Sequence, residues 1–387
     1  MDDRILVIAD YFDSKQNAGG APVSLQNLLK LINKHGYKAF VITRNKDFNT
    51  KERYIFDKEK INNDGQQIVF YIDRLWPIIL MKKFRKLSYS IIYLNSFFST
   101  LSIVTLLYFN LYRNSKKIII SSKGELYYGA IHSHNSMIKR LYIWFFNVFL
   151  SSKAIFHFSS EDEFQITKKY ININKHYIAL DIYERNEFHS NESHKNNGFN
   201  IIFLSRIDEK KNLMFACNVI AKLKVNINFD IYGAIGDSDY FNKCIQILKN
   251  CDKNINYSYN GVLNKQDAEK AFTKYDLFIF PTKGENFGYV ILESLDCGCP
   301  IILSLNTTLW NNLQEMDSGF NISLENEEEW IIAIQKIYEA KMNKDFRYVS
   351  GAKQYTARNT IIKNAAEDNM KIFDIEYNRH NSSCIIP

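Results

Sequence analysis

Residues 277–294 read LFIFPTKGENFGYVILES, and they hold the clearest structural signal in the chain. The apolar run Leu277–Pro281 has the length of a buried strand, residues 282–286 are polar, and Phe287–Cys297 follows with helical spacing. A buried strand, a short polar loop and a helix form the repeating unit of a parallel sheet that is covered by helices. The stretch therefore predicts an α/β domain.

The same unit recurs on both sides of this stretch. Short apolar runs predict further strands at Ile201–Ser205, Phe229–Tyr232, Asn256–Tyr259 and Ile301–Leu305. Helical spacing predicts helices at Asn212–Lys224, Ser238–Lys249, Lys265–Tyr275 and Glu327–Lys341. Strands that alternate with helix-length segments predict a parallel sheet with both faces covered.

The first half of the chain alternates in the same way. Its predicted strands are Ile5–Ala9, Lys38–Thr43, Gln67–Ile72, Ser90–Ser96, Lys117–Ser121 and Ala154–Ser159. A loop with Gly19 and Gly20 follows the first strand, and Pro22 is predicted as the first residue of the next helix. Ser160–Glu163 has the Ser-x-x-Glu pattern of a capping box at the start of another helix.

Composition and length indicate a soluble globular protein of two or three domains. The chain has 387 residues, of which 46% are hydrophobic and 24% charged, and these values exclude disordered and collagen-like classes. Leu87–Tyr112 has no charge, but nine of its residues are Ser, Thr or Asn. Lipid-spanning helices of about 20 residues are far less polar. We therefore expect a strand and then a helix, Phe98–Tyr112, in this stretch.

The domain boundaries follow from a change in pattern. Glu184–Asn200 is polar and lacks any periodicity, which is typical of a linker. We expect a first domain at residues 1–180, a linker at 181–200, a second domain at 201–358, and a helical segment at 359–387 that can return to the first domain. The two domains are expected to be Rossmann-like and doubly wound.

Charge is distributed unevenly between the two halves. Residues 1–180 have a net charge of +12 and residues 181–387 of −5. The first domain is therefore expected to face an anionic partner, and charge alone leaves nucleic acid, a membrane surface and a phosphorylated acceptor open. The cluster 81–87 alternates cations with apolar residues and predicts contact with an anionic membrane. A second cluster, Lys139 and Arg140, precedes the run 141–146, whose aromatic residues suit a membrane interface. For this run, a buried helix is the favoured interpretation.

Two loops that follow predicted strands contain candidate site residues. Arg206 and Lys211 lie just before a helix, where cations and unpaired N–H groups can hold a diphosphate. Glu285 lies in a loop and Glu293 in the next helix, eight residues apart, so they can share a face. The ordinary alternatives are solvated loop cations, a capping Glu and an exposed helical Glu. No G-x-G-x-x-G or G-x-x-x-x-G-K-[ST] motif occurs, which argues against dinucleotide and Walker-type sites.

Taken together, the motifs resemble the retaining glycosyltransferases of family 4, whose GT-B fold has two Rossmann-like domains that face a central cleft. The matching segments in the second half are Ser205–Asn212, Phe229–Gly233, Pro281–Glu293 and Cys297–Pro300. The first half resembles a subgroup associated with bacterial surface polysaccharide synthesis. The matching segments there are Gly19–Gly20, Tyr93–Phe98, Ile120–Gly129 and Ser159–Glu161.

The resemblance implies roles for individual residues. The implied catalytic residues are Glu285, which would hydrogen-bond the donor sugar, and Arg206 and Lys211, which would neutralise the departing diphosphate. The implied donor-binding residues are Gly19, Gly20, Arg206, Lys211, Glu285, Asn286, Phe287, Gly288 and Glu293, with Glu293 on the ribose. Related proteins often show Ser-Pro-Arg-Gly where this chain has Ser121–Gly124, so Lys123 and Gly124 are placed on the acceptor side. Neither His132 nor His134 can be assigned as a catalytic histidine.

The activity implied by the resemblance is retaining transfer of a hexosyl or N-acetylhexosaminyl group from a nucleotide-diphosphate sugar. The acceptor would be a saccharide on a polyprenyl-diphosphate carrier, in capsule, O-antigen or exopolysaccharide synthesis. The first domain would bind the acceptor and the second the nucleotide sugar. The protein would be cytoplasmic and peripheral at the inner face of the plasma membrane, with an anionic membrane surface and no nucleic acid as partner.

No cofactor or metal is expected, because a cationic pair can stabilise the leaving group without a metal ion. Two alternatives stay open. One is a sugar-nucleotide epimerase of the same fold, against which the combination of Arg206, Lys211, Glu285 and Glu293 argues. The other is a non-catalytic GT-B partner subunit, which the departure at Ser121–Gly124 keeps open.

Overall fold

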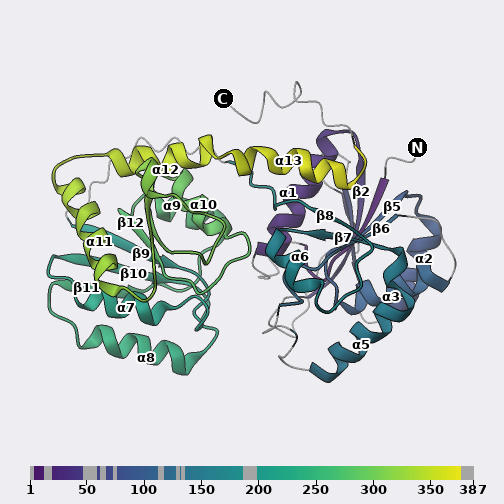
Figure 1. Ribbon diagram of the computed structural model, residues 1–387, viewed down its shortest axis with the longest axis horizontal. Coiled ribbons are helices and arrows are strands. Elements are labelled where there is room, and N and C mark those ends of the chain that lie inside the picture. Colours follow the sequence, from purple (N-terminus) through teal and green to yellow (C-terminus); the bar gives the residue numbers. More distant parts are fainter. Residues whose placement is uncertain are drawn as a thin grey trace. The chain divides into compact units, whose positions relative to one another are not determined.

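The computed structural model describes residues 4–12, 20–46, 59–61, 67–72, 76–111, 117–127, 131, 136–185 and 198–375. These residues form two compact units (Figure 1). Unit 1 contains the described residues up to Tyr183 together with those from Ile361 onward, and unit 2 is Glu184–Thr360. Each unit is a predominantly parallel sheet with helices, so the α/β prediction is confirmed. Most of the predicted linker, residues 186–197, lies outside the described residues.

Unit 1 has an eight-stranded sheet with the order β3-β4-β2-β1-β5-β6-β7-β8. Its strands are β1 Arg4–Ile8, β2 Lys38–Arg44, β3 Glu59–Ile61, β4 Gln67–Ile72, β5 Ile91–Leu94, β6 Lys117–Ser121, β7 Ala154–Phe158 and β8 Lys175–Ile178. The pair β3–β4 is antiparallel and the other pairs are parallel. The chain extends outward from β1 and then returns to β5 on its other side. The switch point of this sheet therefore lies between β1 and β5.

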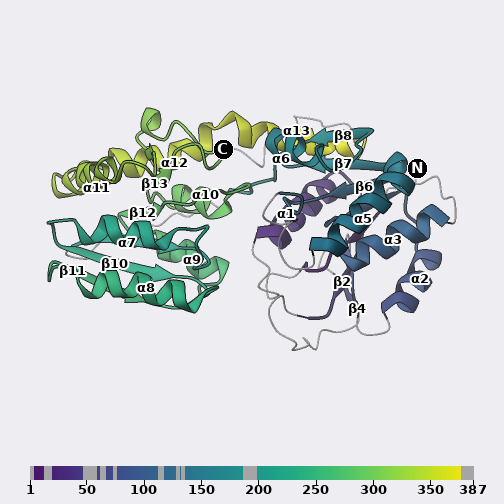
Figure 2. The same ribbon diagram turned by 60° about the horizontal axis from the view of Figure 1, so that its bottom comes forward.

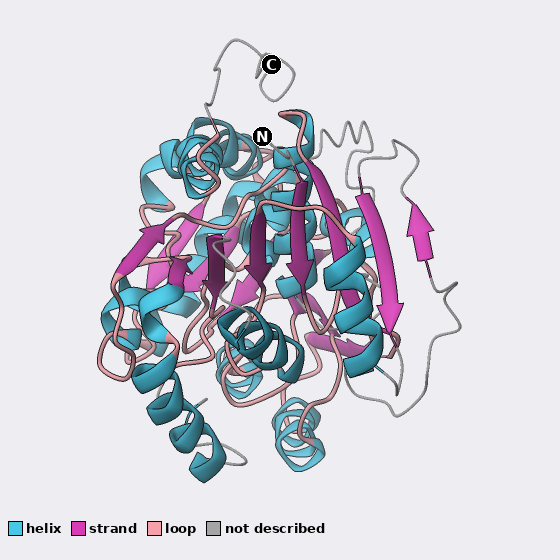
Figure 3. Ribbon diagram, turned by 90° about the vertical axis from the view of Figure 1, so that its right-hand side faces the viewer, coloured by secondary structure: helices cyan, strands magenta, loops and turns pink. Residues whose placement is uncertain are grey.

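Helices cover both faces of this sheet (Figure 3). They are α1 Gly20–Lys34, α2 Trp76–Lys86, α3 Thr100–Leu111, α5 Ser136–Phe149, α6 Glu161–Thr167 and α13 Thr360–Ile372. Successive strand residues point to opposite faces. Leu6 and Ile8 of β1 accordingly join a core with α2, α3 and α5, whereas Ile5 and Val7 join a second core with α1 and α13. The C-terminal helix α13 is thus part of unit 1.

Unit 2 has a six-stranded parallel sheet with the order β11-β10-β9-β12-β13-β14. Its strands are β9 Phe199–Leu204, β10 Ile227–Tyr232, β11 Ile255–Tyr259, β12 Leu277–Phe280, β13 Ile301–Ser304 and β14 Gly319–Ile322. Its helices are α7 Leu213–Ala221, α8 Ser238–Lys249, α9 Lys265–Phe272, α10 Tyr289–Asp296, α11 Glu327–Met342 and α12 Arg347–Arg358, and α7 and α8 lie side by side (Figure 2). The switch point lies between β9 and β12.

Three strands were not predicted, and several helices begin one or two residues away from their predicted starts. β3, β8 and β14 were not predicted, because they are edge strands of three or four residues without a continuous apolar run. Helix α1 begins at Gly20, so Pro22 is its third residue and not its first. Proline is still tolerated there, since the N–H groups of the first turn have no acceptor within the helix.

The uncharged stretch 87–112 contains β5 and α3, as the predicted strand and helix required. Among the described residues, no helix is long and apolar enough to cross a membrane.

Candidate active site

Two loops of unit 2 meet at the switch point of its sheet. One follows β9 and the other follows β12, and these strands are neighbours. The Lys283 amide donates to the Lys210 carbonyl over 2.8 Å, and the Thr282 hydroxyl donates to the same carbonyl over 3.3 Å. The two loops are therefore joined to each other at the edge where α/β sheets bind ligands.

The structure brings Lys211 and Glu285 together. Lys211 Nζ forms an ion pair with Glu285 Oε1, and the two side chains are only 14% and 16% exposed. Burial lowers the pKa of Lys211 to about 8, the nearby cation Lys210 acts in the same direction, and Asp208 acts against them. The contact with Glu285 also favours the charged form. A shielded ammonium and a carboxylate, one from each loop, thus lie in contact where the two loops meet.

Arg206 is held by Asp208, a residue to which the sequence analysis assigned no role. Arg206 Nε donates to Asp208 Oδ2 over 2.6 Å, and Asp208 Oδ1 accepts the Lys211 amide over 3.0 Å. Asp208 thereby joins the Arg206 side chain to the backbone of Lys211. The Arg206 side chain remains 57% exposed, so its guanidinium retains solvent access. The spacing of an acid two residues after Arg206 and three before Lys211 could have identified it.

The loop after β12 is fixed by its neighbours while three of its amides stay available. The Glu285 amide donates to the Thr307 carbonyl over 2.9 Å, and the Phe287 carbonyl accepts from the Trp310 indole. The Phe287 ring is buried against Trp310, with centroids 5.2 Å apart. In the described part of the chain, the amides of Asn286, Phe287 and Gly288 have no hydrogen-bond acceptor. These donors at the start of α10 can hold an anionic or hydroxyl oxygen.

Two glycines are required by the backbone around this site. Gly288 precedes α10 with a φ of +76°, and an added Cβ would lie 2.7 Å from Ile291 Cδ1. Gly233, directly after β10, has a φ of +142°, and an added Cβ would lie 1.8 Å from the Ser205 carbonyl oxygen. A side chain at Gly233 would displace the loop after β9, and at Gly288 the positive φ strains any residue other than glycine. Glu293 lies in the second turn of α10 and is partly buried.

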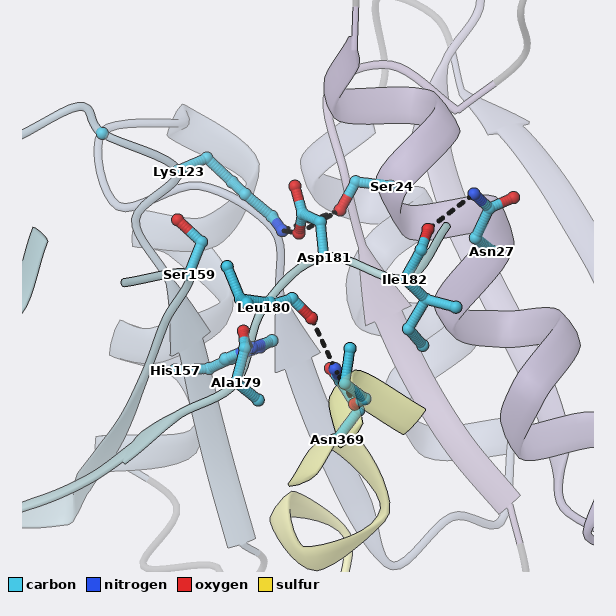
Figure 4. A network of polar contacts seen from close by, with 12 residues as sticks. Ser24, Asn27, Lys123, His157, Ser159, Ala179, Leu180, Asp181, Ile182 and Asn369 are labelled. Atoms are coloured by element: carbon cyan, nitrogen blue, oxygen red, sulfur yellow. Dashed lines mark hydrogen bonds and ion pairs between the residues drawn. The ribbon is translucent and has the colours of Figure 1, made fainter. Parts of the chain in front are cut away.

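Unit 1 uses its predicted acceptor-side residues internally (Figure 4). Lys123 has a φ of +47°, and its Nζ lies 2.6 Å from Asp181 Oδ1 and 2.9 Å from Ser24 Oγ. Burial disfavours the charged ammonium, but the Asp181 carboxylate outweighs burial and raises the pKa of Lys123. The Gly124 amide donates to Glu163 Oε1 over 2.6 Å. Lys123 and Gly124 therefore both have partners within unit 1.

The network around Lys123 also fixes the segment Ala179–Ile182, which follows β8 (Figure 4). The contacts to its backbone carbonyls come from His157 on Ala179 at 3.0 Å, Asn369 on Leu180 at 2.7 Å and Asn27 on Ile182 at 2.8 Å. These three side chains belong to β7, α13 and α1. This segment is thus held by side chains from three separate elements.

The predicted capping box is confirmed for its serine. Ser160 Oγ accepts the Glu163 amide over 3.1 Å. The Glu163 carboxylate instead accepts from Ser122 Oγ at 2.7 Å and from the Ser159 amide and hydroxyl at 2.8 Å. Glu163 therefore joins the loops after β6 and β7. Gly20 is the first residue of α1, whereas Gly19, His132 and His134 lie outside the described residues.

A second polar group at the switch point of unit 1 was missed by sequence reasoning. Asp10 follows β1, and its Oδ1 accepts from Arg44 Nε and from Ser99 Oγ, both at 2.7 Å. Asn95, directly after β5, is buried and its Oδ1 has no hydrogen-bond partner. Asp10 comes immediately after a predicted strand, and this position could have identified it as a candidate site residue.

Within the described residues, no group of three His, Cys, Asp or Glu side chains is placed to hold a metal ion. The Asp237-Ser238-Asp239 sequence begins α8, where Asp237 Oδ1 accepts the Tyr240 amide over 3.0 Å. This pair of acids is explained by helix capping.

Comparison with known proteins shows what the second half of the chain is similar to. Residues 184–355 match the family model described as Glycosyl transferases group 1. An uncharacterized 41.2 kDa protein in the cps region of Klebsiella pneumoniae is 23% identical over 287 residues, which are 71% of this chain and 76% of that protein.

Two solved structures show the fold. HepE from Anabaena, in complex with UDP and glucose, has a TM-score of 0.67 at 17% identity and covers 94% of this chain and 98% of its own. WaaG, a glycosyltransferase involved in lipopolysaccharide biosynthesis, has a TM-score of 0.63 at 10% identity. The match covers 95% of this chain and 99% of WaaG. The predicted GT-B fold is confirmed, and residues 184–355 are similar to the group 1 glycosyl transferases.

Proposed function

We propose that this transferase moves a sugar, with retention of anomeric configuration, from a nucleotide-diphosphate donor to a saccharide acceptor in surface polysaccharide synthesis. The observation that carries the proposal is the Lys211–Glu285 pair beside three available amides at the unit 2 switch point. The complex of HepE with UDP and glucose supports the donor class. The relative in a cps region and the likeness to WaaG support capsule, O-antigen or exopolysaccharide assembly.

In this proposal, the second domain stabilises the charges that develop as the glycosidic bond breaks. Lys211 and Arg206 neutralise the departing diphosphate, and the amides of Asn286, Phe287 and Gly288 donate to donor oxygens. Glu285 accepts from donor-sugar hydroxyls and keeps Lys211 in place, while Glu293 accepts from the ribose. The acceptor hydroxyl attacks the face that the diphosphate leaves, and a phosphate oxygen of the leaving group takes its proton. Cations supply the charge stabilisation, so no metal is required.

The first domain binds the acceptor, which we propose to be a saccharide on a polyprenyl-diphosphate carrier at the inner face of the plasma membrane. Because Lys123 is paired with Asp181, its charge stabilises the loop and is not directed at the acceptor. Asp10 is a better candidate for contact with an acceptor hydroxyl, since its carboxylate is 28% exposed at the unit 1 switch point. Gly19 and Gly20 leave space for donor phosphates at the start of α1.

One observation favours a second candidate, the non-catalytic partner subunit: Lys123 and Gly124 are both engaged within unit 1. A single experiment separates the candidates. The purified protein is incubated with a panel of nucleotide sugars, with and without a lipid-linked acceptor, and products are followed by NMR. Transfer with a retained anomeric configuration supports the proposal. An epimerised nucleotide sugar indicates an epimerase, and no turnover of any donor indicates a partner subunit.

A further inference from the structure

Helix α5 exposes a continuous apolar stripe to solvent. Met137, Leu141, Trp144 and Val148 follow one another at intervals of four, three and four residues, which places them on one side of the helix. The large apolar side chains exposed on α5 are Met137, Ile138, Leu141, Trp144, Val148 and Phe149. Only the opposite side, with Ile143 and Phe146, is buried. The prediction that residues 141–146 form a buried helix is therefore wrong for Leu141 and Trp144, which are 66% and 59% exposed.

The stripe lies beside two other helices of unit 1 that, like α5, carry no acidic residue. Helices α2, α3 and α5 pack on the same face of the sheet, with α3 between the other two (Figures 1 and 2). None of the three helices contains Asp or Glu. Lys82, Lys86 and Arg140 are exposed on α2 and α5. Apolar residues beside uncompensated cations complement an anionic, partly apolar surface.

We infer that α5 is the element that inserts into the interface of an anionic lipid bilayer, with Lys82, Lys86 and Arg140 against the headgroups. This inference rests on the proposed function, since a lipid-linked acceptor requires the enzyme at a membrane. Trp144 suits the position, because its ring is apolar and its N–H can reach the polar headgroup region. A protein partner or a second copy would also cover apolar residues, but neither explains the lack of acids on three adjacent helices.

Unit 2 supplies a matched control. Ile332 and Met342 on α11 are each 47% exposed, but this helix begins with Glu327, Glu328 and Glu329. We compare Leu141→Gln/Trp144→Gln with Ile332→Gln/Met342→Gln in co-sedimentation with phosphatidylglycerol and phosphatidylcholine vesicles. The parent and the α11 variant are expected to bind phosphatidylglycerol vesicles at low salt. The α5 variant is expected to bind about tenfold more weakly or worse, since two large apolar side chains no longer insert.

The cations are tested separately with Lys82→Gln/Lys86→Gln/Arg140→Gln. Lys83 is left unchanged, because its ammonium lies 3.3 Å from the centroid of the Phe70 ring and serves the fold. This variant is expected to lose most of the preference for phosphatidylglycerol over phosphatidylcholine. Added salt is expected to weaken vesicle binding by the parent and to have little effect on binding by the variant, because salt screens the charges that the variant lacks.

Trp144 also provides a direct signal of insertion. Trp310 and Trp330 are fully buried, so in a Trp76→Phe background a vesicle-dependent blue shift and quenching by brominated lipid report on Trp144. The inference is overturned if the parent fails to bind phosphatidylglycerol vesicles at low salt, or if the α5 and α11 variants bind equally well. It is also overturned if gel filtration shows that the α5 variant has lost a dimer that the parent forms.

The docking surface and the proposed function fail separately. Transfer to a soluble saccharide acceptor is expected to be the same in the parent and in the α5 variant. Vesicle binding without any sugar transfer would reject the proposed function and leave the docking surface in place. Sugar transfer without vesicle binding would reject α5 as a membrane-docking element and leave the proposed function in place.

Discussion

The ends of the parallel strands carry paired charges in both units, yet the pairs differ in what surrounds them. In unit 2, the Lys211–Glu285 pair lies beside three amides that have no acceptor in the described chain. In unit 1, the Lys123–Asp181 pair is completed by Ser24 and lies in a network whose members bond to one another. The first arrangement has donors left for a ligand, and the second has used its donors to hold loops. An ion pair at a strand end therefore indicates a binding site only when its neighbours remain unsatisfied.

The largest effect is expected from Glu285→Ala. Loss of this carboxylate removes the proposed contact to the donor sugar and frees Lys211 to move, so turnover should fall about 100- to 1,000-fold. Steady-state rates with the preferred donor measure the loss. Circular dichroism should show a folded protein, and Glu285→Gln should retain more activity because it keeps one acceptor oxygen. Turnover close to that of the parent would remove Glu285 from the mechanism.

Lys123→Met tests the other side of the comparison. It leaves Asp181 buried without its cation, and unit 1 is expected to lose about 3 kcal/mol of stability, measured by denaturant unfolding. The affinity for the nucleotide diphosphate should be unchanged. The double variant Lys123→Met/Asp181→Leu should recover part of the stability. A Lys123→Met protein of normal stability with weakened donor binding would reverse the roles of the two pairs.

Arg206→Ala is expected to reduce turnover about 100-fold, the lower end of the range for one electrostatic group. The Arg206 side chain is more than half exposed, so the stability of the protein should not change. Arg206→Lys should recover part of the rate, because it restores charge but not the planar guanidinium. Rates equal to the parent's in the Ala variant would show that Lys211 acts without it.

Unit 1 should also lose stability in acid through His157. Burial lowers the pKa of His157 to about 4 from 6.5, so between these values the unfolded chain binds the extra proton. The stability is fully present above pH 6.5 and falls toward pH 4, by up to about 3 kcal/mol. Thermal melts across this range measure the slope. A His157→Gln variant should show a flatter slope, and an identical slope would assign the acid sensitivity to other groups.

The smallest effect is expected from metal removal. Since the cations Arg206 and Lys211 are proposed to neutralise the diphosphate, transfer rates should stay within experimental error after treatment with EDTA. Complete loss of activity, restored by magnesium or manganese, would show that the diphosphate is held by a metal ion.

The sequence predicted the central strands and the unit 2 loops because their signals are local. Continuous apolar runs mark β9 and β12, and the residues that meet at their ends are within eight positions of each strand. The unit 1 network joins Lys123 to Asp181 and Asn369 to Leu180, across 58 and 189 residues, so no spacing reveals it. The exposed side of α5 was also missed, since an almost continuously apolar run does not show which side faces the core.

The central claim is that the Lys211–Glu285 pair belongs to a nucleotide-diphosphate site. The most direct test is the melting temperature of the parent and of Lys211→Gln with UDP, GDP, ADP and the matching nucleosides. We expect one diphosphate, and not its nucleoside, to raise the melting temperature of the parent by several degrees. A ligand at a concentration of 100 times its Kd stabilises the folded protein by about 2.7 kcal/mol. The Lys211→Gln protein should lose that shift. An equal shift in both proteins, or no shift with any diphosphate, would contradict the account.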